Sequence, residues 1–373
     1  IDVPHFNPKH LIFVNSITKD TISKKHVHLN HIKKNGNKTH ETTAELLDKN
    51  HIRYTINNKK LIIKRGVYSI KSDVIIASKY DVLIQKGTVF NMDNAINFGI
   101  KGNVTIDGSA KENVVIRNLN SKGSFGSFII VGQDSLSYAN INFLRVSGGN
   151  AAYFMGRQST SQFSIFNSNV VLKNAVFEHS NADDGLNIKY SKVLIDSSKF
   201  INNLADQVDL DFCFATISNC QFSPSLIDSN GDGLDLSGSY AKVSNCVFAG
   251  FLDKGLSIGE KSRVLVNNCK FNENALAIAL KDETTLYSWS NYFYTNKEDY
   301  TAFVKKPLFK IPNLYLGESS NELKLNLIEV NKFELDENDI QIEKKRFLTK
   351  YKQYRGSSEL SNILSLGKII SNY

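Results

Sequence analysis

Apolar and polar positions alternate in short runs along the middle of the chain, and one run occurs four times. Its copies read DGLNI, DQVDL, DGLDL and KGLSI, and they start at Asp184, Asp206, Asp232 and Lys254. The starts are 22, 26 and 22 residues apart. A second run recurs between them and ends at Phe200, Phe222, Phe248 and Phe271. Repetition at this period is typical of a solenoid, in which each repeat buries its apolar face against its neighbours.

The repeated runs have the two-residue period and the β-branched content of strands. Asn, Gly, Asp and Ser interrupt them, as expected where a coil must turn, and no helical stretch lies between them. A period near 22 residues with several short strands predicts an all-β fold, a right-handed parallel β-helix or solenoid. We expect the solenoid at residues 54–300, an N-terminal cap before it and a C-terminal α/β tail after it.

The two ends of the chain differ from the middle. Residues 1–53 hold seven of the eight histidines and read as a basic lead-in and cap. His26, His28 and His31 could ligate a metal, but no carboxylate or Cys lies beside them, which favours a flexible segment. The run Thr42–Lys49 predicts a short helix that plugs the first coil. Residues 301–373 read as a cap or extension with a helix within 336–354, and this tail could attach a partner protein.

Two internal features bear on the coils. Phenylalanines at one place in each repeat predict an internal stack of Phe143, Phe177, Phe200, Phe222, Phe248, Phe271 and Phe293. The first gap in this series is longer than the others, and it indicates an insertion at Met155–Asn167 that either borders a groove or is a loop without function. Cys220, Cys246 and Cys269 share one place in successive coils, which predicts a ladder of buried thiols rather than disulfides or a metal site.

Outward positions of the four-fold run collect acidic residues. Alternation along a strand points its apolar residues inward and the following residues outward, in three columns: Asn187, Asp209, Asp235 and Ser257; Lys189, Asp211, Ser237 and Gly259; and, at the strand starts, Asp184, Asp206, Asp232 and Lys254. Neighbouring strands lie about 4.8 Å apart. At ~5 Å, two carboxylates repel by roughly 3 kcal/mol at an effective dielectric constant near 20.

This crowding predicts raised carboxyl pKa values, a bound cation, or pairing with the two lysines. Carboxylate oxygens suit Ca²⁺, and a Ca²⁺ site would use Asp184, Asp206, Asp209 and Asp235. Aspartates whose side chains hydrogen-bond to the backbone at the solenoid corners would explain the strand-start column. They would not explain the mid-strand residues, where Asp is disfavoured.

From residue 54 to 296 the chain resembles the right-handed β-helix repeat proteins of the pectate-lyase-like superfamily. The run DDGLNIKYS…DLDFC…GDGLDLSGS…DKGLSIGEKS is most similar to the β-helix domains that accompany CotH-type proteins. Polygalacturonase-type hydrolases also place Asp on adjacent coils, but Lys254 and Ala277 stand where that family has His and Arg. The resemblance therefore implies the fold and leaves the activity open.

These observations favour a polysaccharide-processing enzyme, with a non-catalytic glycan- or protein-binding module as the alternative. The candidate catalytic residues are Asp209, Asp211, Asp232, Asp235, Lys254 and Lys189. A hydrolase would use two of the aspartates as acid and base, whereas a lyase would use Ca²⁺ and a lysine base. The net charge of +8 favours an anionic polysaccharide or cell-surface glycan, while the acidic columns make nucleic acid an unfavourable partner. We expect an extracellular, periplasmic or cell-surface location, and no run approaches the ~20 apolar residues of a membrane span.

Overall fold

The computed structural model describes residues 13–14, 21–22, 41–120, 122–134, 136–225, 230–319 and 322–356. The chain forms two compact units, residues 1–41 and 42–373. In the first unit, β1 (Phe13–Val14) pairs antiparallel with β2 (Thr21–Ile22). The predicted basic segment with His26, His28 and His31 lies outside the described residues.

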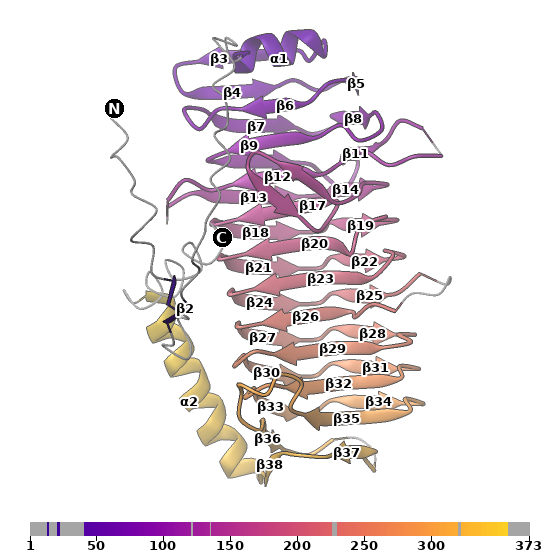
Figure 1. The fold of residues 1–373 in the computed structure, drawn as a ribbon, viewed down its shortest axis with the longest axis vertical. Helices are drawn as coiled ribbons and strands as arrows, with labels where there is room; N and C mark the ends of the chain where they lie inside the picture. The colour runs from indigo at the N-terminus through magenta and orange to yellow at the C-terminus, as the bar shows by residue number, and fades with distance from the viewer. Residues whose placement is uncertain are drawn as a thin grey trace. The chain divides into compact units, whose positions relative to one another are not determined.

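The second unit is a parallel solenoid whose coils contribute strands to three sheets (Figure 1). In the described residues, the first sheet contains β3 (Tyr54–Asn57), β4 (Lys60–Ile63), β7 (Asp81–Gln85), β10 (Val104–Asp107), β13 (Tyr138–Asn142), β18 (Asn169–Lys173), β21 (Lys192–Asp196), β24 (Phe214–Ser218), β27 (Tyr240–Ser244), β30 (Arg263–Asn267), β33 (Thr285–Trp289), β36 (Asn313–Leu316) and β38 (Asn331–Glu334).

The second sheet contains β5 (Val67–Ile70), β8 (Val89–Met92), β11 (Val114–Asn118), β14 (Leu144–Ser147), β19 (Val176–Glu178), β22 (Lys199–Ile201), β25 (Gln221–Ser223), β28 (Val247–Ala249), β31 (Lys270–Asn272) and β34 (Tyr292–Tyr294). The third sheet contains β6 (Val74–Ile76), β9 (Phe98–Lys101), β12 (Phe128–Val131), β17 (Phe163–Phe166), β20 (Asp184–Lys189), β23 (Asp206–Asp211), β26 (Leu234–Ser237), β29 (Lys254–Gly259), β32 (Leu276–Lys281), β35 (Glu298–Phe303) and β37 (Leu325–Leu327).

The register of the third sheet reproduces the outward columns that the sequence predicts. Asn187 lies beside Asp209, which lies beside Asp235, which lies beside Ser257. Gly185, in the first copy of the repeated run, lies in close contact with its surroundings. A Cβ atom on Gly185 would come within 2.7 Å of the Gln207 carbonyl oxygen on the next coil. A larger residue there would push the coils apart.

Stacked phenylalanines fill the interior along the second sheet. The rings of Phe177, Phe200, Phe222, Phe248, Phe271 and Phe293 follow one another with centroid separations of 4.6–5.5 Å. The prediction that Phe143 begins this stack is wrong. Phe143 sits at a turn with φ of +46°, and Val146 is the residue that pairs with Phe177.

The thiols of the predicted ladder, at Cys220, Cys246 and Cys269, are buried and free, as is Cys213. Burial raises the pKa of the Cys213 and Cys246 thiols, so both stay protonated and unreactive. The ladder is a packing feature, as predicted.

A short helix caps the first coil. The helix α1 (Thr43–Lys49) begins with a capping box between Thr42 and Glu45 and buries Leu46 and Leu47. The Thr43 hydroxyl accepts a hydrogen bond from the Ala77 amide at 3.0 Å, next to strand β6. Because α1 satisfies groups at the open edge of the third sheet, the predicted plug is confirmed.

Strands of the first and third sheets continue past residue 300, where the repeat fades in the sequence. Strands β35 to β38 extend the solenoid to Glu334. Helix α2 (Glu337–Gly356) follows, overlapping the helix predicted within 336–354 and ending two residues later, and it lies along the first sheet (Figure 1). Its Phe347 and Tyr351 pack with Phe214, Tyr240 and Trp289 of that sheet.

The insertion between the coils is shorter than predicted. Strands β15 (Ala152–Phe154) and β16 (Arg157–Ser159) form an antiparallel hairpin that leaves the coil. The rest of the predicted insertion, at Phe163–Phe166, forms β17 of the third sheet, where Phe163 and Ile165 are fully buried. The apolar run in that segment therefore belongs to the core.

Candidate functional site

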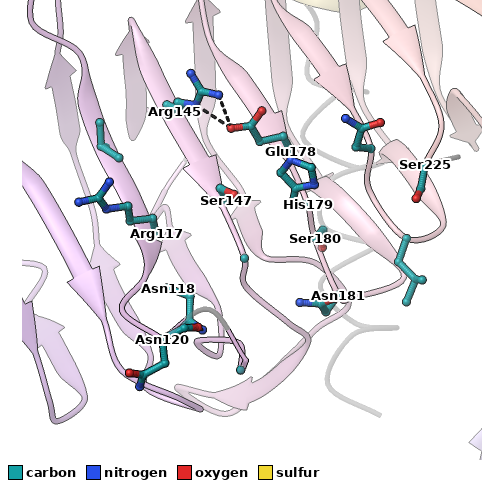
Figure 2. A pocket seen from close by; sticks show the side chains of 15 residues that line it. Arg117, Asn118, Asn120, Arg145, Ser147, Glu178, His179, Ser180, Asn181 and Ser225 are labelled. Atoms are coloured by element: carbon teal, nitrogen blue, oxygen red, sulfur yellow. Dashed lines mark hydrogen bonds and ion pairs between the residues drawn. The ribbon is translucent and has the colours of Figure 1, made fainter. Parts of the chain in front are cut away.

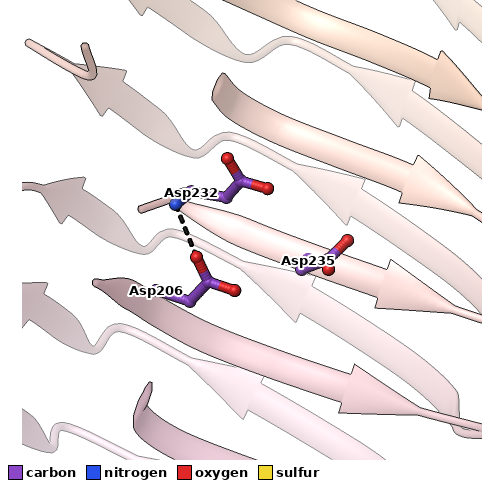
Figure 3. Close-up of side chains that lie close together, drawn as sticks. All are labelled: Asp206, Asp232 and Asp235. Atoms are coloured by element: carbon purple, nitrogen blue, oxygen red, sulfur yellow. Dashed lines mark hydrogen bonds between the residues drawn. The ribbon is translucent and has the colours of Figure 1, made fainter. Parts of the chain in front are cut away.

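Three of the predicted aspartates converge at the start of strands β23 and β26 (Figure 3). One oxygen from each of Asp206, Asp232 and Asp235 lies within 4.8 Å of the others. The Asp232 amide donates a hydrogen bond to Asp206 Oδ1 at 2.7 Å. Asp235 Oδ1 is buried and has no hydrogen-bond partner among the described residues. We call these residues the Asp triplet.

Burial gives carboxyl groups on this face an affinity for protons near neutral pH. It raises the pKa of Asp206 to about 8, and the neighbouring Asp232 charge adds to this effect. Burial also raises the pKa of Asp184 to about 7, although the Thr160 hydroxyl donates to its carboxylate at 2.5 Å and opposes the shift. Burial raises the pKa of Asp232 as well, so the predicted rise in carboxyl pKa is present at all three aspartates of the strand-start column.

The two lysines at this face are held in ion pairs. Lys254 Nζ lies 3.0 Å from Asp232 Oδ1 and 2.5 Å from Asp253 Oδ2. Lys189 Nζ lies 2.6 Å from Asp211 Oδ2. Burial opposes the charge of each ammonium, but the adjacent carboxylates outweigh it and raise the pKa of both lysines. Both therefore stay protonated, and the geometry does not support the lysine base that the lyase hypothesis needs.

The predicted Ca²⁺ ligands come together only in part. Asp184 accepts the Thr160 hydroxyl, and Asp209 Oδ2 accepts a hydrogen bond from Asn187 Nδ2 at 2.6 Å. The group that converges combines the predicted ligands Asp206 and Asp235 with Asp232. Oxygens bound to one Ca²⁺ lie up to about 5 Å apart, so the triplet fits the donor chemistry of this ion.

Only part of the outward column is open to solvent. Asp209 and Asp235 are half-buried, whereas Asn187 and Ser257 on either side are fully buried. On β32 the column continues with Ala279, and Lys281, two residues further along, reaches back and donates from Nζ to the Ser257 hydroxyl at 2.7 Å. A ligand would therefore reach the carboxyl groups between β20 and β29.

An aromatic pair flanks this opening. Tyr190 and Phe212 follow Lys189 and Asp211, and their rings stack with a centroid separation of 5.4 Å. Both residues have left-handed backbone conformations, with φ near +54° and +53°, which turn the chain at the end of each strand. A Cβ atom on Gly238 in the next coil would meet the Phe212 ring at 2.7 Å. Gly238 therefore leaves the room that Phe212 needs.

Sequence reasoning missed a polar cleft on the second sheet (Figure 2). Its volume is about 820 Å³, and Arg117, Arg145, Glu178 and His179 are among the residues that line it. The register aligns Arg117 with Ser147, and Ser147 with Glu178, in one outward column. Arg117 on β11 and Arg145 on β14 lie two residues apart in register, and these two arginines were a signal for the cleft. The signal was missed because the sequence of these strands does not follow the repeated run.

Comparison with known families identifies the fold. A family model described as "Right handed beta helix region" matches residues 184–334. The chain is a right-handed parallel β-helix. This confirms the fold class that the sequence predicts, whereas the link to CotH-associated domains stays a prediction. No curated protein matches the chain at a significant level.

Several solved structures are similar to the chain at low identity. An alginate lyase from Paenibacillus sp. str. FPU-7 shares 12% identity over 66% of this chain and 93% of its own, with a TM-score of 0.36. PfbA, a surface adhesin of Streptococcus pneumoniae, shares 12% over 73% and 81%, with a TM-score of 0.38. The A-module of a mannuronan C-5 epimerase from Azotobacter vinelandii shares 9% over 66% and 89%, with a TM-score of 0.34. These likenesses concern the fold alone.

Neither helix in the described part of the chain is long and apolar enough to cross a bilayer.

Proposed function

We propose that this β-helix cleaves an acidic glycan and that the Asp triplet supplies its acid and its nucleophile. The observation that carries the proposal is the carboxyl group of Asp206, whose pKa of about 8 keeps a proton available at neutral pH next to Asp235. A glycosidic oxygen must be protonated as it leaves, and a carboxyl group protonated at the working pH is suited to this task.

The spacing within the triplet favours a two-step displacement. Enzymes that activate a water directly keep their carboxyl groups roughly 6.5–9.5 Å apart, whereas those that form a covalent intermediate keep them about 5–5.5 Å apart. The oxygens of the triplet lie within 4.8 Å, nearer to the second arrangement. Asp235 attacks the anomeric carbon while Asp206 protonates the leaving oxygen, and water then releases the sugar from Asp235 with Asp206 as base.

The triplet is also the place where we propose Ca²⁺ would bind. Asp206, Asp232 and Asp235 would hold the ion, and an ion bound there would displace the Asp206 proton and occupy the Asp235 nucleophile. Proton binding and Ca²⁺ binding therefore compete at this site, and cleavage is expected of the protonated, ion-free triplet. Lys254 pairs with Asp232 Oδ1, which leaves Oδ2 of that residue for the ion. The net charge of +8 supports an anionic glycan as substrate and a location outside the cytoplasm, where such glycans occur.

A non-catalytic binding module is the second candidate. The observation that favours it is the burial of Asp184 and Asp232, which are only 4% and 6% exposed. Carboxyl groups buried to this extent can stabilise the turns of the coils through hydrogen bonds without contacting a ligand.

Matched variants separate the two candidates. The substrates would be polygalacturonate and alginate, and the readout would be the release of reducing ends. We expect Asp206→Asn and Asp235→Asn each to lower turnover at least a hundredfold without loss of folding. Asp107→Asn, an exposed aspartate of the first sheet, is the control and should retain full turnover. Unchanged turnover in the triplet variants would refute the catalytic role, and wild-type binding without cleavage would favour the binding module.

A further inference from the structure

The cleft on the second sheet has the features of a binding site separate from the Asp triplet. We propose that it binds a uronic-acid saccharide, with the sugar carboxylate on Arg117. The cleft lies over β11, β14 and β19, whereas the triplet lies on the third sheet. The inference therefore stands whether or not the Asp triplet is catalytic.

The two arginines of the cleft differ in their pairing (Figure 2). Arg145 donates from Nε to Glu178 Oε1 at 2.6 Å, and its Nη2 lies 2.6 Å from the same oxygen. Arg117 donates from Nε to Asn91 Oδ1 at 2.8 Å and pairs with no carboxylate in the described part of the chain. Arg117 thus brings an unbalanced positive charge, and Asn91 orients its guanidinium while the terminal nitrogens stay available.

A guanidinium held in this way matches a carboxylate better than a lysine would. Its planar fork donates two parallel hydrogen bonds to the two oxygens of a carboxylate. The Arg145–Glu178 pair beside it has no net charge, because the buried Glu178 carboxylate offsets the charge of the Arg145 guanidinium. Of the two arginines, Arg117 therefore offers an anion the more favourable electrostatic interaction.

Hydrogen bonds fix the rim of the cleft in advance. Asn181 Nδ2 donates to Ser124 Oγ at 2.7 Å, which joins the turns after β11 and β19. Asn120 Nδ2 donates to Asp93 Oδ1 at 2.8 Å and attaches the same turn to an earlier coil. A rim that is ordered before binding reduces the entropy that a ligand must overcome.

The remaining lining favours a sugar over other anionic ligands. None of the described residues that line the cleft is Phe, Tyr or Trp, so a nucleobase has no large aromatic ring to stack on beyond the His179 imidazole. Val115 and Leu204 are the large apolar side chains there, which gives a peptide little to anchor on. Asn and Ser side chains suit sugar hydroxyls, and about 820 Å³ lies within the roughly 300–1,000 Å³ of small-ligand sites.

Calorimetric titration of the full chain with short oligogalacturonates and alginate oligomers tests the proposal. We expect at least one of them to bind, and Arg117→Gln to weaken it about tenfold or more, as expected for a lost charge-assisted pair. Arg117→Lys should fall between Arg117→Gln and wild type, because it keeps the charge and loses the fork. Arg346→Gln on α2 removes an equal charge elsewhere and should bind like wild type.

Four results would overturn the proposal: no uronic-acid oligomer binds, neutral dextran fragments bind equally well, dextran sulfate displaces the uronate with higher affinity, or Arg117→Gln binds within twofold of wild type. Asp235→Asn distinguishes this site from the proposed catalytic site, because it should abolish turnover and leave this affinity unchanged. Thermal unfolding of each variant shows that the fold is retained.

Discussion

At the scale of single residues, the Asp triplet brings like charges together in a way that ordinary surface aspartates avoid. Asp206 gains a backbone hydrogen bond from Asp232, but burial and the neighbouring carboxylate outweigh it and raise its pKa to about 8. The charge of Asp232 thus favours the protonated form of Asp206, and the same crowding of carboxylates favours the binding of a cation.

The raised pKa of Asp206 makes stability depend on pH. The native state holds more protons than the unfolded chain between the usual Asp pKa near 4 and the folded value of about 8, so stability falls as pH rises through this window. Asp206→Asn removes this term and should be more stable than wild type at pH 8, by on the order of 2 kcal/mol, and similar to it at pH 4. Urea unfolding at both pH values measures the difference. A variant less stable than wild type at pH 8 would contradict the assignment.

Lys254 should matter in the opposite sense. Its ammonium group pairs with the carboxylates of Asp232 and Asp253. The side chain of Lys254 is only 15% exposed and that of Asp232 only 8%. Lys254→Met leaves these carboxylates unpaired and should cost about 3 kcal/mol at pH 8, and less at pH 5, because burial raises the pKa of Asp232 and lower pH favours its protonated form. Thermal unfolding across this range checks the prediction, and Lys270→Met, an exposed lysine of the second sheet, is the control. An equal loss at both pH values would show that Lys254 acts only through packing.

At the scale of elements, the strands of the repeat could be predicted from the sequence, and the turns could not. The outward column from Asn187 to Ser257 follows from a two-residue period and a constant register, which is why it was predicted correctly. The position of Phe143 was predicted wrongly because its left-handed backbone conformation places it in a turn before the strand. The spacing of the phenylalanines in the sequence does not reveal this turn. The cleft around Arg117 depends on irregular turns, and no repeat in the sequence marks them.

The boundary at residue 300 shows the same limit. Strands β36 and β38 pair in register with the first sheet, but their residues no longer repeat the earlier coils. Pairing through the backbone continues after the side-chain pattern has faded, because the hydrogen bonds of a parallel ladder do not require a particular side chain.

Helix α2 should be held to the first sheet by its aromatic face. Phe347 is 2% exposed and contacts Tyr240 with a centroid separation of 4.8 Å. Phe347→Ala should weaken docking of the helix by about 3 kcal/mol while the solenoid stays folded. Hydrogen exchange would then rise within α2 and stay unchanged in the strands. Lys344→Ala, on the exposed side of the helix, is the control, and exchange that rises equally throughout the coils would contradict local docking.

At the scale of the whole molecule, one rigid stack of coils presents two chemically different faces. The third sheet carries the Asp triplet, and the second sheet carries the arginine cleft. Each coil contacts only its neighbours, so a ligand bound at one face directly stabilises the coils that it touches. A ligand that binds only the folded state also raises the free energy of unfolding of the whole solenoid by mass action.

Calcium should therefore raise the thermal midpoint of the whole protein. An ion that binds only the folded state adds about 2.7 kcal/mol at a hundred times its dissociation constant. We expect the midpoint to rise with Ca²⁺ in wild type and to stay constant in Asp235→Asn, with Asp107→Asn responding like wild type. A midpoint that does not change in wild type would show that the triplet binds protons rather than Ca²⁺.

The measurement that tests the central claim most directly is a product analysis of the wild-type protein acting on oligogalacturonates and alginate oligomers. Time-resolved NMR distinguishes the configuration of each new reducing end and detects unsaturated sugars in the same spectrum. We expect saturated products that first appear with retained configuration, because Asp235 forms a covalent intermediate that water then releases. Unsaturated products, inverted configuration at first release, or no cleavage of any acidic glycan would contradict it.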